Sequence, residues 1–272
     1  VASKLYRENK DLHQFTDFSN KGNEIAFGTI GNASTSEGVF WEVLNAACVM
    51  QVPMLMSVWD DGYGISVPAK YQTTKENIST ILKGFETDKN GTGMEIFHAR
   101  GWNYAELCNA YKQAADVCRT KHTPALVHVT EVTQPQGHST SGSHERYKSE
   151  ERLKWEIDFD CIQKFKEWIL AFNVNGLALA SLEDLETIQN EAKEKVRLAK
   201  NTAWKSFNDS IKKDYSALIA ILKSLADESP NGVFITKEIE GLEKTSEPIR
   251  KDIVSLARKV LRMVRAENSP AK

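Results

Sequence analysis

Cysteine is scarce in this 272-residue sequence, and long apolar runs are absent. The four cysteines stand far apart without a Cys-x-x-Cys pair, so we expect free thiols in a reducing compartment rather than a disulfide framework or a zinc site. No apolar run reaches the length of a membrane-spanning helix, so no membrane partner is expected. A formal net charge of −2 gives no sign of nucleic-acid binding.

The first residues also lack an initiator methionine and a secretory signal pattern, and we expect the true N-terminus to lie further upstream. Hydrophobic residues make up 41% of the chain and charged residues 26%, which is ordinary for a globular protein with a sizeable core. The length predicts one large domain, or one domain with appendages.

The stretch 31–66 contains two polar turns, each directly after an apolar run. The runs 24–30 and 53–59 are predicted strands, and apolar side chains recur at helical spacing in 36–51 between them. This order implies parallel strands joined by a right-handed crossover. Because ligands of open α/β sheets bind beyond the carboxyl ends of the strands, we expect both turns to face one crevice.

These two turns carry the groups that a magnesium–diphosphate site needs. The first turn opens a helix, whose free backbone N–H groups and dipole favour a phosphate. The Asn32 carboxamide, the Asp61 carboxylate and backbone carbonyls around Gly62 and Tyr63 are hard oxygen ligands, which suit a magnesium ion shared with phosphates. Asparagine and aspartate are also common turn formers, and turn chemistry alone favours that plainer interpretation.

The order of residues resembles the thiamine-diphosphate motif of the α subunits of 2-oxo acid dehydrogenases, which reads Gly-Asp-Gly and later Asn-Asn-x-Tyr-Gly. Asn32 stands at the aspartate, Asp61 stands at the second asparagine, and the segment 36–45 between them also fits the pattern. The resemblance implies that Asn32, Asp61 and the Tyr63 carbonyl hold magnesium. It further implies that the residues lining thiamine diphosphate are Gly31, Ala33, Ser34, Gly64, Ile65 and Ser66.

The chain departs from this pattern by carrying a carboxamide first and a carboxylate second. The formal charge of the ligand pair is unchanged, so metal binding is still expected. An amide oxygen is nevertheless a weaker ligand than a carboxylate for a hard cation. We therefore expect Asn32→Asp to tighten magnesium-dependent cofactor binding.

Further along, predicted strands at 94–99 and 124–132 flank a predicted helix at 104–121. Strands that alternate with helices predict an α/β fold with a parallel sheet covered on both faces. Two histidines, His98 and His128, lie within the strand segments and are interpreted as packing or surface residues, since no partner for either is evident in the sequence.

The polar stretch 133–149 follows the last predicted strand and could close over the crevice. It resembles the active-site loop of the same family, with a Gly-His-Ser segment ending at Ser139 and with Arg146 and Tyr147 behind it. The resemblance implies that His138 approaches the diphosphate and the reacting centre and helps in acyl transfer, because histidine can donate to phosphate or move a proton near neutral pH. The alternative interpretation is a flexible surface loop with incidental histidines.

Two positions of this loop bear on regulation. Ser139 matches the serine that is phosphorylated in mitochondrial relatives, which makes it a candidate regulatory residue. The aspartate often found after the serines is replaced by Gly142.

The remainder of the chain is predicted to be helical, with segments at 150–172, 181–208 and 215–225 and an apolar stripe along 249–264. No catalytic motif is found after Tyr147. Some relatives fuse α-like and β-like halves in one polypeptide. We therefore expect a thiamine-diphosphate-binding domain, truncated at its N-terminus, at residues 1–172, and a helical extension or linker toward a β-like half at residues 173–272.

As a whole, the resemblance implies the decarboxylating first component of a 2-oxo acid dehydrogenase complex, nearest to the branched-chain enzymes that act on 3-methyl-2-oxobutanoate. The implied cofactors are thiamine diphosphate and magnesium. The implied partners are a β subunit or β-like half, which supplies part of the active site, and a lipoyl acyltransferase, in a homodimer or heterotetramer. The implied compartment is the bacterial cytoplasm, or the mitochondrial matrix for a eukaryotic protein.

Three alternatives remain open from the sequence. The substrate could be pyruvate or acetoin. A different thiamine-diphosphate enzyme, such as a transketolase, would use the same fold but should lack the Gly-His-Ser loop. A non-catalytic assembly module would explain the asparagine at position 32 as a lost metal site.

Overall fold

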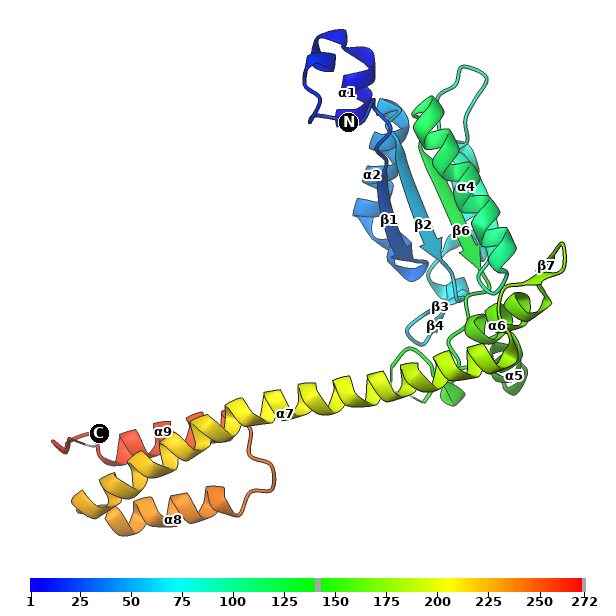
Figure 1. Ribbon diagram of the computed structural model, residues 1–272. Coiled ribbons are helices and arrows are strands. Elements are labelled where there is room, and N and C mark those ends of the chain that lie inside the picture. Colours follow the sequence, from blue (N-terminus) through cyan, green and yellow to red (C-terminus); the bar gives the residue numbers. More distant parts are fainter. Residues whose placement is uncertain (140–142, 271–272) are drawn as a thin grey trace. The chain divides into compact units, whose positions relative to one another are not determined.

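The computed structural model describes residues 1–139 and 143–270. The chain divides into two compact units, Val1–Leu182 and Glu183–Lys272, which are described separately (Figure 1). The elements of the first unit that position the site are β1 (Ala26–Gly31), α2 (Gly38–Met50), β2 (Met54–Trp59), β3 (Tyr63–Gly64), β4 (Val67–Pro68), α3 (Ile78–Ile81), η5 (Leu82–Phe85), β5 (Glu95–Arg100), α4 (Tyr104–Lys121), β6 (Ala125–Thr130), α5 (Glu150–Asp158) and α6 (Cys161–Ala171).

A four-stranded sheet with the order β1-β2-β6-β5 forms the centre of the first unit, and all of its pairings are parallel. Successive side chains of β6 enter two separate cores, because neighbouring residues of a strand point to opposite faces. Leu126 packs with residues of α2, α3 and η5, whereas Val127 packs with residues of α4. The predicted α/β fold with helices on both faces of a parallel sheet is confirmed.

The two long covering helices follow from local signals. Leu44 of α2 is fully buried, and the helix ends at Gln51, which adopts a left-handed conformation. Asn103 caps α4 by accepting a hydrogen bond from the Glu106 N–H, and the small residue Ala114 lets that helix lie close on the sheet. Because both helices are crossovers between parallel strands, every strand ends at the same edge of the sheet.

The helix predicted across 150–172 is two helices. The break lies at Asp160, whose carboxylate accepts a hydrogen bond from the Gln163 N–H and thereby begins α6. An N-cap signal inside an apolar periodic segment therefore marks a helix boundary here.

The second unit contains α7 (Leu182–Glu228), α8 (Gly232–Glu243) and α9 (Arg250–Met263). The two helices predicted at 181–208 and 215–225 are one continuous helix of 47 residues, because the residues between them include no glycine or proline. The end of α7 packs with α8 and α9 around a core that includes Leu222, Ile235 and Val260. The apolar stripe of α9 therefore packs within this chain. Residues 186–207 of α7 are exposed on every side.

None of the helices in the described residues combines the length and the apolar character needed to cross a bilayer.

Candidate functional site

A cavity of about 590 Å³ lies beyond the carboxyl ends of β1 and β2. Backbone hydrogen bonds tie together the segments that leave the strands. The Asn32 N–H donates to the Trp59 carbonyl at 3.0 Å, and the Asp60 N–H donates to the Val129 carbonyl at 2.8 Å. The two polar turns therefore lie side by side at one edge of the sheet.

Most of the predicted site residues line this cavity, namely Gly31, Asn32, Ala33, Ser34, Asp61, Tyr63, Gly64, Ile65 and His138. Ser66 lies in the exposed turn between β3 and β4 and is not part of the lining. The lining also lacks Ser139, Arg146 and Tyr147. The structure thus joins the two turns with His138 and leaves the rest of the predicted loop residues outside the cavity wall.

Asn32 presents a free side chain from a fully bonded backbone. Its N–H donates to Trp59, and its carbonyl accepts from the Thr35 N–H at 3.1 Å and from the Thr35 hydroxyl at 2.6 Å. The residue is 6% exposed, yet its carboxamide has no hydrogen-bond partner among the described residues. A buried polar group in a cavity wall needs a partner, so this amide oxygen is available to a ligand.

In the second turn, the Asp61 side chain is hydrogen-bonded to the backbone. An oxygen of the Asp61 carboxylate accepts the Tyr63 N–H at 3.0 Å, and the Gly62 carbonyl accepts the Ala69 N–H at 2.9 Å. Burial raises the pKa of Asp61, while the Tyr63 N–H and the cations of Lys148 and Arg152 act in the opposite direction. A carboxylate that has lost part of its hydration gains from a nearby cation.

A series of hydrogen bonds through Asp60, His128 and Ser79 supports the same turn from the side of the sheet. Asp60 accepts the Gly62 N–H at 2.8 Å with one oxygen and lies 2.9 Å from His128 Nε2 with the other. His128 Nδ1 lies 2.8 Å from the Ser79 hydroxyl on α3, and the ring is fully buried. His128 is therefore a packing histidine with two polar partners. These partners could not be predicted from the sequence, because they lie 49 and 68 residues away.

Gly64 is where the two turns approach each other. A Cβ at this position would lie 2.7 Å from the Cβ of Ala33 and would overlap the Gln72 amide nitrogen. The side-chain amide oxygen of Gln72, Oε1, is buried without a hydrogen-bond partner among the described residues, and Gln72 lines the cavity. The cavity thus offers a narrow backbone approach and an unused acceptor, which fits a bound organic cofactor.

Ile65 adopts a left-handed conformation with φ of 58°. This conformation is strained for a β-branched residue and persists only where the surrounding structure enforces it. Such strain clusters at ligand-binding sites. Its position in the cavity wall directly after Gly64 fits that pattern.

The loop after β6 reaches the second turn through aromatic contacts. The rings of Tyr147 and Tyr63 lie 5.6 Å apart, and the backbone of His138 hydrogen-bonds the Tyr147 hydroxyl. Arg146 is exposed, and Ser139 is exposed next to His138. The expected departure at Gly142 lies outside the described residues.

The oxygen donors fit a magnesium ion. Asn32 supplies an amide oxygen, Asp61 supplies a carboxylate, and Tyr63 has a backbone carbonyl in the same wall. Magnesium prefers such ligands and commonly completes its coordination with substrate phosphates. Within residues 1–139 and 143–270, no group of three His, Cys, Asp or Glu side chains converges as a separate metal site.

The sequence matches a known protein family over most of its length. The model of the family described as "Dehydrogenase E1 component" matches residues 2–211. That range includes both turns, the loop with His138 and the first half of α7.

Curated relatives have the same character. The pyruvate dehydrogenase E1 component subunit alpha of Rickettsia bellii is 25% identical over 185 residues, which cover 68% of this chain and 52% of the relative. A mitochondrial 2-oxoisovalerate dehydrogenase subunit alpha 1 of Arabidopsis thaliana is 26% identical over 151 residues, covering 55% and 30%. The 2-oxoisovalerate dehydrogenase subunit alpha of Bacillus subtilis is 25% identical over 188 residues, covering 68% and 54%. The chain spans about half of the length, or less, of these relatives.

Proposed function

This chain belongs to the dehydrogenase E1 component family, and we propose that it is the α-like, cofactor-binding part of a 2-oxo acid dehydrogenase. In this proposal the protein decarboxylates a 2-oxo acid oxidatively and passes the acyl group to a lipoyl group of an acyltransferase component. The observation that supports it most is the pairing of an unpartnered Asn32 amide with the partly desolvated Asp61 carboxylate in one cavity.

Each side chain has a role in this proposal. Asn32, Asp61 and the Tyr63 carbonyl hold magnesium, and the ion is shared with a diphosphate. Thiamine diphosphate, when bound, supplies the electron sink for the loss of carbon dioxide. His138 donates to the diphosphate or moves a proton during acyl transfer. Ser139 is a proposed site of phosphorylation beside His138.

The cofactor contacts are proposed for the rest of the cavity wall. Because Gly64 brings the chain close to Ala33, the backbones of both turns can approach the cofactor. The proposed contact residues are Gly31, Ala33, Ser34, Gly64, Ile65 and Ser66. Ser66 requires a local movement to take part, since it lies outside the lining.

The substrate proposed is a branched-chain 2-oxo acid of the 3-methyl-2-oxobutanoate type. The names of the Arabidopsis and Bacillus relatives support this choice. The Rickettsia relatives support pyruvate as the alternative. We propose a cytoplasmic location, with the mitochondrial matrix as the alternative for a eukaryotic protein.

The proposed assembly includes a β subunit or β-like half and a lipoyl acyltransferase, with the oligomer a homodimer or heterotetramer. We propose that residues 1–172 bind the cofactor and that residues 173–272 connect this domain to the β-like half. The family match covers residues 2–211 and so continues past residue 172 into α7. This supports the proposal that both parts belong to one protein of this family.

An activity assay tests the proposal on the full-length protein assembled with its β-like half. The assay contains thiamine diphosphate, magnesium and an artificial electron acceptor, and the 2-oxo acids are 3-methyl-2-oxobutanoate, 4-methyl-2-oxopentanoate, pyruvate and 2-oxoglutarate. We expect turnover of 3-methyl-2-oxobutanoate that disappears without the cofactor. Turnover of pyruvate alone would identify pyruvate, rather than a branched-chain 2-oxo acid, as the substrate.

A thermal-shift measurement accompanies the assay, because a ligand that binds the folded state raises the melting temperature. If no substrate is turned over and magnesium with thiamine diphosphate does not raise the melting temperature, a non-catalytic assembly module is favoured.

A further inference from the structure

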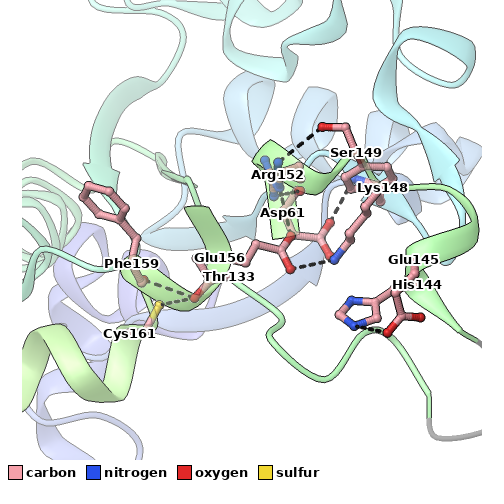
Figure 2. Close-up of polar contacts among 11 residues, drawn as sticks. Asp61, Thr133, His144, Glu145, Lys148, Ser149, Arg152, Glu156, Phe159 and Cys161 are labelled. Atoms are coloured by element: carbon pink, nitrogen blue, oxygen red, sulfur yellow. Dashed lines mark hydrogen bonds and ion pairs between the residues drawn. The ribbon is translucent and has the colours of Figure 1, made fainter. Parts of the chain in front are cut away.

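Glu156 is a charged residue in the last turn of α5 with no solvent exposure. A carboxylate in this position requires cationic partners, because its hydration has been removed. One oxygen lies 2.8 Å from Lys148 Nζ, and the other accepts from Arg152 Nε at 2.9 Å. Figure 2 shows both cations converging on this side chain. Lys148 is itself buried, so the cluster is a built feature rather than a surface ion pair.

Lys148 and Arg152 contact the second turn of the cavity as well as Glu156. A terminal nitrogen of Arg152 donates to the Asp61 carbonyl at 2.7 Å. Lys148 Nζ lies 5.4 Å from the centre of the Tyr63 ring, and the Arg152 guanidinium carbon lies 5.6 Å from it. Through these two cations Glu156 is linked to Asp61 and Tyr63, two of the three residues proposed to hold magnesium, although it touches neither of them.

The charges around Asp61 are of both signs. Lys148 and Arg152 carry the positive charges, Glu156 and Asp61 carry negative charges, and the Asp60 carboxylate adds a further negative charge next to Asp61. Removal of the Glu156 charge would make the surroundings of Asp61 more positive by one charge, in a region where burial weakens screening by solvent. That change would weaken the attraction of this turn for a divalent cation.

We propose that Glu156 is a positioning residue for the magnesium–diphosphate site. It fixes Arg152 so that the guanidinium holds the backbone of Asp61, and it fixes Lys148 against the Tyr63 ring. It also cancels one of the two positive charges next to the metal-binding turn. This inference rests on the proposed function, and it adds a control of magnesium affinity from outside the cavity wall.

The test compares Glu156→Gln with wild type in the full-length protein assembled with its β-like half. Magnesium is titrated at saturating thiamine diphosphate and followed by thermal shift and by turnover. We expect the half-saturating magnesium concentration to rise at least tenfold in the variant, with a much smaller change in kcat at saturating magnesium. Glu150→Gln, which removes an exposed carboxylate from the same helix, should match wild type.

Two further variants keep the test decisive. Arg152→Lys retains the charge but cannot bridge Glu156 and the Asp61 carbonyl, so it should also raise the magnesium requirement, and it decides the matter if Glu156→Gln does not fold. The double variant Lys148→Met with Glu156→Gln removes one charge of each sign and should recover part of the magnesium affinity.

The failures are distinguishable. A wild-type protein without a magnesium- and cofactor-dependent shift would overturn the proposed function, and this inference with it. A wild-type protein that shifts, with folded Glu156→Gln and Arg152→Lys variants of unchanged magnesium requirement, would overturn the inference alone.

Discussion

The two turns of the cavity are supported in different ways. The turn at Asn32 is fixed mainly by backbone hydrogen bonds, to the Trp59 carbonyl on β2 and to Thr35, with one more from the Thr35 hydroxyl. The turn at Asp61 is fixed by side chains from three other elements or segments: His128 on β6, Arg152 on α5, and Lys148 just before α5. A turn held by backbone hydrogen bonds depends little on the identity of other side chains, whereas a turn held by distant side chains can be disturbed by substitutions at many positions.

Gly64→Val should have the largest effect, because Gly64 is where the two turns meet. The new Cβ would lie 2.7 Å from the Ala33 Cβ, so the turns would have to separate. Separation of the turns removes the close backbone approach to the cofactor, so we expect thiamine diphosphate affinity, measured by calorimetry, to fall by at least about 100-fold. Gly84→Ala is the control, since a Cβ there meets nothing within 4 Å. Equal affinities of the Gly64 variant and wild type would contradict the site.

His128→Ala would remove the support of the second turn from the sheet side. The change leaves a cavity and deprives both Asp60 and Ser79 of a partner, which should lower the free energy of unfolding by about 2–4 kcal/mol in urea titrations. His98→Ala is the matched control, because His98 pairs with His128 in the sheet register but is exposed. If the free energy of unfolding fell no further than in the control, the hydrogen bonds of His128 would not support the fold.

Asn32→Asp changes a metal ligand of the first turn and leaves the second turn as it is. A carboxylate is a better magnesium ligand than an amide, and the backbone of this turn needs no adjustment. We expect magnesium-dependent cofactor binding to tighten roughly tenfold, or ~1.4 kcal/mol. A titration that shows equal or weaker binding by the variant would refute this expectation.

Glu24→Gln should produce the smallest effect and should leave the magnesium requirement unchanged. Hydrogen bonds from the Ser19 hydroxyl and the Asn20 N–H lower the pKa of Glu24 to about 2. Because this pKa lies below the unfolded value, the carboxylate stabilises the fold above about pH 4.5, and this contribution is lost as the pH falls toward 2. Glu24 is exposed, so we expect a loss of roughly 2 °C in melting temperature at pH 7.

The pH series supplies the check on that prediction. The difference between Glu24→Gln and wild type should shrink below pH 4 and vanish near pH 2. A difference that persists at pH 2 would show that the glutamine acts by another route.

Sequence reasoning located the first turn better than the supports of the second. Phe40 and Leu44 belong to the apolar face predicted by the helical spacing of 36–51, and both are buried. Asn32 and Asp61 line one cavity because parallel strands end at one edge. Periodicity reports which face of an element is buried. It does not report which side chain from another element will lie against that face.

For this reason the polar supports were missed. Glu156 lies among charged residues that are typical of a solvated helix, and nothing local distinguishes it from the exposed Glu150. Gln72 likewise lies in a polar segment, and its unpartnered oxygen becomes evident only when the cavity is seen. Buried polar residues are defined by tertiary contacts, and a single sequence does not contain those contacts explicitly.

The exposed part of the long helix α7 determines where the chain should unfold locally. Across residues 186–207 no side chain is buried, so this part of the helix is held by its own backbone hydrogen bonds. Most of the stability of a helix in a protein comes from packing of an apolar face, which this part of α7 lacks. Deuterium should therefore enter these backbone amides, and proteases should cut there, by local fraying that leaves the sheet core and the three-helix core folded.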